Sequence, residues 1–336
     1  MKLKNFKCFL IFSMLLLFIS CGEKDKKDEK QKLDNVDVVL DWYPNAIHCF
    51  IYNAIEKGYF KDEGINVNIH FPANTYDALT LPASKKVDIG IYYLHHLIMA
   101  RVNENIPVKS IGAIVQKPLN VIISLKENNI TRPRDLENKT IGYSGAVLTE
   151  KTIKDMVACD GGNPENIKLV DVGFDLLTSM ITKRVDATNG GLVNHEVPVM
   201  INKGFDVNYF YPNNYGIPDY YEEVFVANED LIKEKKDVYI RFLRACQKGF
   251  KDMKNNREDS LNILLGKQEA QEFPLTHEVE KQSIDILIPL MEEKESPFLS
   301  QDEKVWQKNI DWLYEHQIIN KKANANEMFL NLYNDK

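Results

Sequence analysis

Short runs of β-branched and aromatic residues alternate with helix-like patterns along most of the chain, and this alternation restricts its fold more than any other feature. After a first run at 36–40, Ile47, Ile51 and Ile55 share one helical face, and Gly58 is the expected end of that helix. The other predicted strands are 67–71, 88–92, 110–115, 121–125, 140–143, 167–172, 185–188, 207–210 and 223–227. Strands separated by helices form βαβ units, so the sequence predicts an α/β fold with mostly parallel sheets.

A polar interruption near the middle of these runs divides them into two series. We therefore expect two α/β lobes, a first built from 36–126 and 225–336 with a helical C-terminal tail, and a second built from 127–224. Extended connections near 125–130 and 221–226 would join them. Two lobes on such a hinge are typical of proteins that close around one ligand.

The N-terminus has the composition of an export signal. Three lysines lie within the first seven residues, and an apolar run from Cys8 to Ile19 follows, which is too short to span a membrane. Phe18 and the residues after it, ending in Cys21, resemble a bacterial lipobox. The first twenty residues are therefore predicted to be a lipoprotein signal peptide, and Cys21 the lipid-modified N-terminus. An ordinary cleaved signal and a membrane helix are the alternatives.

Residues 21–35 are predicted to be a charged tether, because 23–32 is almost wholly charged and of mixed sign. The formal net charge is −7, and loss of the lysine-rich signal would make the mature chain more acidic still. Nucleic acid is therefore not an expected partner. The expected location is outside the cytoplasm, lipid-anchored at the outer face of the cytoplasmic membrane or in the periplasm.

The mature chain would keep three cysteines, Cys49, Cys159 and Cys246, which are too far apart to indicate a disulfide framework. We expect all three to be small buried apolar residues. The adjacent His95 and His96 cannot share a helical face, and neither a zinc-ligand spacing nor a nucleotide-binding motif occurs. The sequence therefore predicts no metal and no cofactor.

One segment resembles the nucleophile elbow of hydrolases. It runs from Gly142 to Ala146, but the elbow requires glycine where Ala146 stands. Ser144 is therefore predicted to be a hydroxyl donor to a ligand rather than a nucleophile.

Candidate ligand-binding residues follow the predicted strands, because ligands of open α/β sheets bind beyond the carboxyl ends of the strands. Flat side chains suited to clamping a planar ring come from Trp42, Tyr43, Tyr92, Tyr93 and Tyr143. Polar candidates are Asn45, His48, His96, Ser144, Gly145, Thr149 and Glu196. Alternatively, the adjacent tyrosines are simply the two faces of one strand.

Glu196 suits an aminopyrimidine, whose edge offers an amine donor beside a ring-nitrogen acceptor. An ionised carboxylate only accepts, so a two-point contact needs one proton, on the ring nitrogen or on the carboxyl group. The alternative for Glu196 is an exposed acid in the first turn of a helix.

Several motifs together resemble bacterial solute-binding proteins for thiamin pyrimidine precursors, the ThiY-like group. They lie at 40–45 with His48, 58–60 with Gly64, 87–91, 106–108, 160–162, 170–174, 194–196, 215–221 and 242–245. The resemblance covers about Val36 to Phe250.

This resemblance implies a type II periplasmic-binding-protein fold, without enzymatic activity, that delivers an N-formylated aminomethylpyrimidine to an ABC importer. Trp42 would stack on the pyrimidine and Glu196 would bind its amino edge. Asn45, Tyr93 and the turn at 143–145 would line the cleft. Tyr221 completes the expected ligand-binding set. The expected partners are the ligand, an ABC permease with its ATPase, and the membrane through Cys21; the protein itself is expected to be a monomer.

Two segments, 92–95 and 143–148, depart from the family pattern, which leaves the identity of the ligand open. Another solute, such as a flavin, an alkanesulfonate or another flat heterocycle, is one alternative. The second is an enzyme like the pyrimidine precursor synthases of the same superfamily. His96 stands where those enzymes place a histidine, but Tyr92 replaces their lysine and 189–196 lacks their cysteines.

Overall fold

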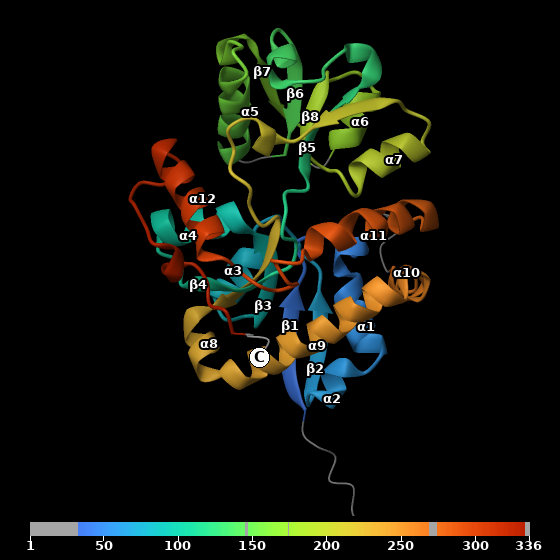
Figure 1. Cartoon of the computed structure of the whole chain (residues 1–336), viewed down its shortest axis with the longest axis vertical. Coiled ribbons are helices and arrows are strands. Elements are labelled where there is room, and N and C mark those ends of the chain that lie inside the picture. The colour runs from blue at the N-terminus through green and yellow to red at the C-terminus, as the bar shows by residue number, and fades with distance from the viewer. Residues whose placement is uncertain (1–32, 145–146, 174, 269–273, 333–336) are drawn as a thin grey trace, which may run out of the picture. The chain divides into compact units, whose positions relative to one another are not determined.

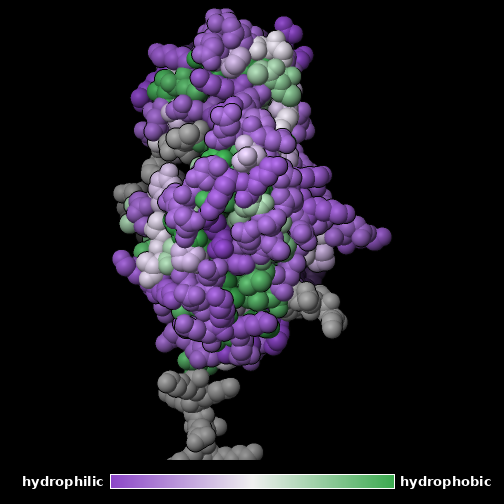
Figure 2. Space-filling model, turned by 90° about the vertical axis from the view of Figure 1, so that its left-hand side faces the viewer, coloured by the Kyte–Doolittle hydropathy of each residue, from purple (hydrophilic) through white to green (hydrophobic). Residues whose placement is uncertain are grey.

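The computed structural model describes residues 33–144, 147–173, 175–268 and 274–332. Its strands form two five-stranded sheets, each flanked by helices (Figure 1). No helix among the described residues combines the length and apolarity needed to cross a bilayer. The face drawn in Figure 2 is mostly hydrophilic, with small apolar patches.

The first sheet has the strand order β2-β1-β3-β10-β4. Its members are β1 (Asp34–Val39), β2 (Ile65–His70), β3 (Ile89–Tyr93), β4 (Val108–Ala113) and β10 (Glu223–Asn228). Strand β10 is antiparallel to both of its neighbours, whereas β1 is parallel to β2 and β3.

The second sheet repeats this plan with the order β7-β6-β8-β5-β9. Its members are β5 (Asn120–Leu125), β6 (Thr140–Tyr143), β7 (Lys168–Asp171), β8 (Ala187–Leu192) and β9 (Val207–Phe210). Here β5 is the antiparallel strand. Each sheet thus receives its antiparallel strand directly after the chain has crossed from the other sheet.

Helices cover both sheets, and the C-terminal part of the described chain is mainly helical, as predicted. Those that follow strands of the first sheet are α1 (Cys49–Glu56), α2 (Tyr59–Asp62), α3 (Asp77–Ala83) and α4 (Leu94–Glu104). Those of the second are α5 (Val147–Cys159), α6 (Leu176–Ile181) and α7 (Glu196–Asn202). After β10 come α8 (Glu229–Glu234), α9 (Lys236–Asn255), α10 (Arg257–Leu265), α11 (His277–Met291) and α12 (Glu303–Glu315).

Short 3-10 turns complete the described elements. They are η1 (Ala46–His48), η2 (Lys126–Asn128), η3 (Pro133–Leu136), η4 (Pro164–Asn166), η5 (Pro212–Asn214) and η6 (Ala325–Glu327).

The predicted boundary between the lobes is wrong by one strand. Strand β5 was expected in the first lobe, but it pairs with β8 and β9 of the second sheet. The two crossings are therefore 114–119 and 211–222, and the segment 125–130, expected to be a hinge, follows β5 within the second sheet. The sheet to which β5 belongs is decided by pairing between residues far apart in sequence, which the local sequence pattern does not predict.

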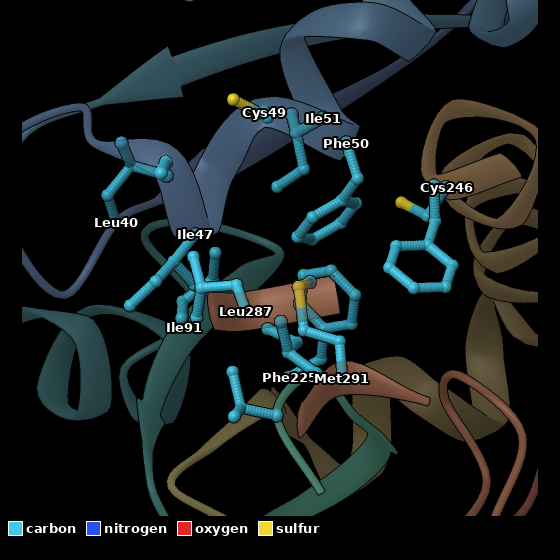
Figure 3. Packing of buried hydrophobic residues seen from close by; sticks show 14 of the residues in the cluster. Leu40, Ile47, Cys49, Phe50, Ile51, Ile91, Phe225, Cys246, Leu287 and Met291 are labelled. Carbon is cyan, nitrogen blue, oxygen red and sulfur yellow. The ribbon is translucent and has the colours of Figure 1, made fainter. Parts of the chain in front are cut away.

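The core of the first sheet joins segments from both ends of the chain (Figure 3). The Phe50 ring of α1 lies 6.0 Å from that of Phe225 on β10 and 5.1 Å from that of Phe298. Helix α9 reaches α1 closely at Gly249, where a Cβ would lie 2.0 Å from the Phe50 carbonyl oxygen. A glycine is required at this crossing because any side chain would separate the helices.

The cysteines behave differently from one another. Cys49 and Cys246 are buried and free, as expected, and burial raises the pKa of both thiols well above the usual range. Cys159, expected to be buried, is free and exposed, because it ends α5 where the chain turns back to the surface.

Candidate functional site

A cavity of about 1080 Å³ is lined by residues from both sheets and from α11. The first sheet contributes the turn after β1 and the end of β3, and the second contributes the segments that follow β6 and β8. These are carboxyl ends of parallel strands, where the fold class predicts a ligand site.

Nine of the candidate ligand-binding residues line this cavity. They are Trp42, Tyr43, Asn45, Tyr92, Tyr93, His96, Ser144, Thr149 and Glu196. Gly145 lies outside the described residues, as do Cys21 and the predicted signal peptide. His48, Tyr143 and Tyr221 are absent from the lining, and each has another role.

His48 was expected to contact the ligand, and the structure places it behind the cavity rather than in its wall. Its ring is fully buried, its Nδ1 accepts the Asn45 N–H at 3.2 Å, and its Nε2 lies 3.0 Å from Asp41 Oδ1. Because Nδ1 is an acceptor, Nε2 carries the proton and donates it to Asp41. His48 therefore holds the turn that carries Trp42.

Tyr143 and Tyr221 are also bound elsewhere. The Tyr143 hydroxyl donates to Glu150, and this hydrogen bond raises the pKa of Tyr143 to about 12. The Tyr221 hydroxyl accepts the Asp302 N–H at 2.7 Å, and its ring lies 6.2 Å from that of Trp306 in the core. Both tyrosines support neighbouring helices because their hydroxyls find partners within the protein.

An aromatic wall forms at the end of β3. The ring centroid of Tyr93 lies 5.1 Å from that of Tyr92 and 5.8 Å from that of His96. Burial lowers the pKa of His96 to about 4, so its imidazole is neutral at pH 7. The Tyr93 hydroxyl donates to Asp41 Oδ2 at 3.1 Å, which fixes this ring against the turn that carries Trp42.

Asp41, His48 and Glu223 are all buried, and the atoms with which they could hold a metal ion lie within 4.8 Å of one another. However, the proton on His48 Nε2 points at Asp41, so this nitrogen has no free lone pair for a cation. Burial, and then the charge of Asp41, raises the pKa of Glu223 well above its usual range. The geometry therefore favours a protonated Glu223 beside Asp41 over a bound metal ion.

Glu196 begins α7, and its Oε2 accepts the Leu192 N–H at 2.7 Å. One carboxylate oxygen is thus bound to the end of β8, while the side chain lines the cavity. Gly191 leaves room for this arrangement, since a Cβ there would lie 3.3 Å from that of Glu196.

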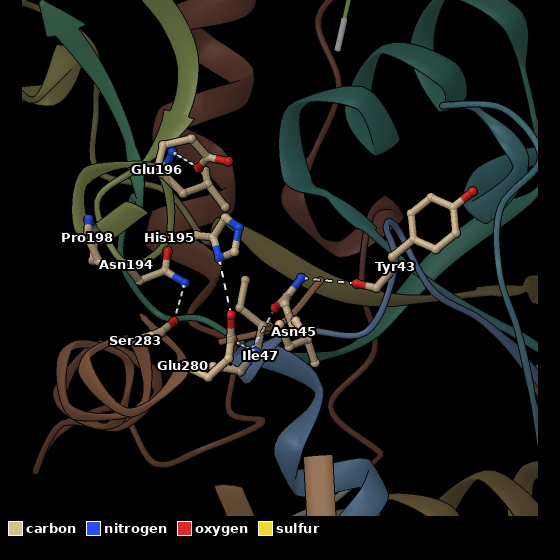
Figure 4. Close-up of polar contacts among 12 residues, drawn as sticks. Tyr43, Asn45, Ile47, Asn194, His195, Glu196, Pro198, Glu280 and Ser283 are labelled. Carbon is tan, nitrogen blue, oxygen red and sulfur yellow. Dashed lines mark hydrogen bonds and ion pairs between the residues drawn. The ribbon is translucent and has the colours of Figure 1, made fainter. Parts of the chain in front are cut away.

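Two buried acids of the cavity were not predicted. Glu280, on α11, is 0% exposed; its Oε2 accepts the Ala46 N–H at 2.9 Å, and its Oε1 lies 3.6 Å from His195 Nδ1 (Figure 4). Glu222 precedes β10 and is 5% exposed. Burial raises the pKa of both carboxyl groups.

A sequence signal existed for only one of these acids. Glu222 and Glu223 form an acidic pair that opens an otherwise apolar strand, whereas Glu280 stands among other charged residues of an amphipathic helix.

The cavity lining is rich in hydrogen-bond acceptors. Its carboxylates belong to Asp41, Asp171, Glu196, Glu222 and Glu280. Among the described lining residues, Lys203 alone carries a lysine or arginine side chain. A ligand with several N–H donors and a flat ring suits this lining, and an anion does not.

Known proteins resemble the chain in sequence. The chain matches the family model described as "NMT1/THI5 like" over residues 45–260. It is 39% identical to the formylaminopyrimidine-binding protein of Halalkalibacterium halodurans over 97% of this chain and 98% of that relative. It is 31% identical to the 4-amino-5-hydroxymethyl-2-methylpyrimidine phosphate synthase THI11 of Saccharomyces cerevisiae, over 47% of this chain and 46% of that enzyme.

Among solved structures, the periplasmic aliphatic sulphonate binding protein SsuA from Escherichia coli is similar, with a TM-score of 0.68 and 12% identity over 88% of this chain and 96% of that protein. The fold predicted from the sequence, two α/β lobes of the periplasmic-binding-protein type, is thereby confirmed. The chain belongs to the NMT1/THI5-like family.

Proposed function

We propose that this protein is the solute-binding component of an ABC importer and captures a thiamin pyrimidine precursor, N-formyl-4-amino-5-aminomethyl-2-methylpyrimidine or a close relative. The observation that carries the proposal is the pairing of Glu196 with the aromatic residues Trp42 and Tyr93 in one cavity. The formylaminopyrimidine-binding relative, aligned over 97% of this chain, supports it.

The protein is a binding protein and not an enzyme. The relative that aligns over nearly the whole chain is a binding protein, whereas the synthase aligns over less than half of it. The segment 189–196, which lines part of the cavity, contains no cysteine.

Binding would involve closure of the two lobes around the ring. Two contacts join the end of β8 to α11: the Asn194 amide donates to Ser283 Oγ at 3.0 Å, and His195 faces Glu280. Directly after α12, His316 Nε2 lies 3.7 Å from Asp155 of α5. A ligand held by Glu196 would favour the arrangement in which these contacts form, because its neighbours Asn194 and His195 make them.

We further infer export and lipid attachment at Cys21, with the protein monomeric and facing an ABC permease and its ATPase. The sequence at 1–21 supports this inference. Several acyl chains, each CH₂ contributing about 0.8 kcal/mol, would hold the chain at the membrane. A Cys21→Ala variant should then appear in the soluble fraction, and membrane retention of that variant would contradict the anchor.

Native mass spectrometry of protein purified without denaturation tests the ligand. The expected result is a bound mass equal to that of the formylated aminopyrimidine, followed by thermal stabilisation when this compound is added to ligand-free protein. A bound alkanesulfonate or flavin, or stabilisation by those compounds alone, would contradict the proposal.

A further inference from the structure

Glu222 occupies a special place in the cavity, because it connects the two crossings between the sheets. Its side-chain Oε2 accepts the N–H of Leu119 at 2.6 Å and that of Asn120 at 3.0 Å, and its own N–H donates to the Val115 carbonyl at 3.1 Å. The residue is 5% exposed and lines the cavity. Its carboxylate is therefore rigidly held at the level of the hinge.

Glu222 still has acceptor capacity. A carboxylate offers about four lone-pair sites. The N–H groups of Leu119 and Asn120 use two of these sites, both on Oε2. Burial raises the pKa of this carboxyl group, whereas the two backbone donors lower it; in its ionised form the carboxylate only accepts hydrogen bonds. A donor from a ligand is a suitable partner for the acceptor sites that these two N–H groups leave open.

The position of Glu222 relative to Glu196 follows from the strand pairing. Asn120 of β5 lies opposite Leu192 of β8, and each gives its N–H to a carboxylate instead of to the other strand. In an antiparallel pair of this kind the two N–H groups face away from each other. Glu222 and Glu196 therefore approach the cavity from opposite sides of the β5–β8 pair.

We propose that Glu222 is a second specificity-determining residue, which accepts a hydrogen bond from an N–H of the ligand that is separate from the amino edge at Glu196. This inference rests on the proposed function. It narrows the ligand class to flat heterocycles with two N–H donors at separate positions. In the formylated precursor the second donor is the amide N–H of the side arm.

The test compares two probes by calorimetry: 4-amino-5-(formamidomethyl)-2-methylpyrimidine, which has the arm N–H, and 4-amino-2,5-dimethylpyrimidine, which lacks the arm. In Glu222→Gln the amide oxygen can still accept the two backbone N–H groups. The second carboxylate oxygen, which would accept the hydrogen bond from the ligand, is then replaced by an NH₂ donor. The preference for the formamidomethyl probe should fall by about tenfold or more, since hydrogen bonds to charged groups are strong.

Glu223→Gln is the matched control, since Glu223 is the adjacent buried acid and is absent from the cavity lining. This control should change both affinities in the same proportion. If Glu222→Gln lost affinity equally for both probes, or lost no affinity, the role of Glu222 would be overturned while the proposed function would stand. Failure of the wild-type protein to bind either probe would overturn the proposed function itself.

A measurement on the wild-type protein makes the test independent of variant folding. The formyloxymethyl analogue, with oxygen in place of the arm N–H, has nearly the same shape but no donor. It should bind about tenfold or more weakly than the formamidomethyl probe. Equal affinity would overturn the inference.

Discussion

His195 Nδ1 lies 3.6 Å from Glu280 Oε1, and this contact joins the start of α7 to α11. Neither atom has a hydrogen bond within the described part of the chain. Ser283, three residues after Glu280 on the same helical face, accepts the Asn194 amide. Two consecutive residues between β8 and α7, Asn194 and His195, thus contact one face of α11.

The Asn194–Ser283 hydrogen bond should slow ligand release. Ser283→Ala removes the acceptor without altering the cavity lining, and a buried neutral hydrogen bond contributes about 0.5–1.5 kcal/mol. We expect dissociation of the aminopyrimidine to accelerate by about two- to tenfold in stopped-flow measurements. Ser84→Ala, at an exposed serine directly after α3, is the control. Unchanged dissociation with lowered thermal stability would show that the contact only supports the fold.

Trp42 should supply ring stacking. Trp42→Ala is expected to weaken binding by about 1–3 kcal/mol, by analogy with base stacking on aromatic side chains. Calorimetry with the formylated aminopyrimidine measures this loss, and Tyr314→Ala, an exposed ring absent from the cavity lining, is the comparison. If the two variants bind equally well, the ligand does not stack on Trp42.

Glu196→Gln should weaken aminopyrimidine binding about tenfold or more, because a hydrogen bond to a charged acceptor contributes about 1.5–3 kcal/mol. The pH dependence of affinity should change as well, since the proton shared between carboxylate and ring nitrogen is lost. Glu278→Gln, an exposed acid of α11 outside the cavity lining, controls for the change in net charge. An unaltered affinity and pH profile would contradict this role.

Glu223 should make stability depend on pH. Burial raises its pKa well above the usual 4.5, so the native state holds a proton that the unfolded chain has already released. The free energy of unfolding therefore falls as pH rises from the unfolded value through the native value. In Glu223→Gln this fall should be smaller, which thermal melts of ligand-free protein between about pH 4 and 8 would reveal. Identical slopes in wild type and variant would refute the assignment.

Much of the fold could be predicted from local pattern. All ten strands of the described residues overlap predicted strands, and the part of the described chain after β10 is mainly helical, as expected for the C-terminal tail. Strand β8 extends to Leu192, past the predicted end at 188, because its ladder with β5 pairs Gly191 with Val121 and Leu192 with Asn120 despite the poor strand propensity of glycine. The strand propensity of a segment depends on its own residues, but the strands with which it pairs do not.

Some residues of the candidate site could likewise be predicted from the sequence, and others could not. Trp42, Tyr93 and Glu196 could be found because each follows a strand, and the carboxyl ends of parallel strands meet at one edge. His48 and Tyr221 are similar polar or aromatic residues at similar places, but their hydrogen bonds to Asp41 and Asp302 draw them out of the cavity. Whether such a side chain contacts a ligand or another residue of the protein depends on which groups lie close to it in the folded structure.

The sequence by itself determined the alternation of strands and helices, the acidic character and the aromatic residues of the turns, since these depend on side-chain chemistry and short-range periodicity. Only the tertiary structure decided which sheet receives β5 and which acids reach the cavity. Glu222 and Glu280 enter it because the chain crosses twice between the sheets and α11 returns against η1. Contacts between residues separated by more than one hundred positions created that wall, and no local pattern encodes them.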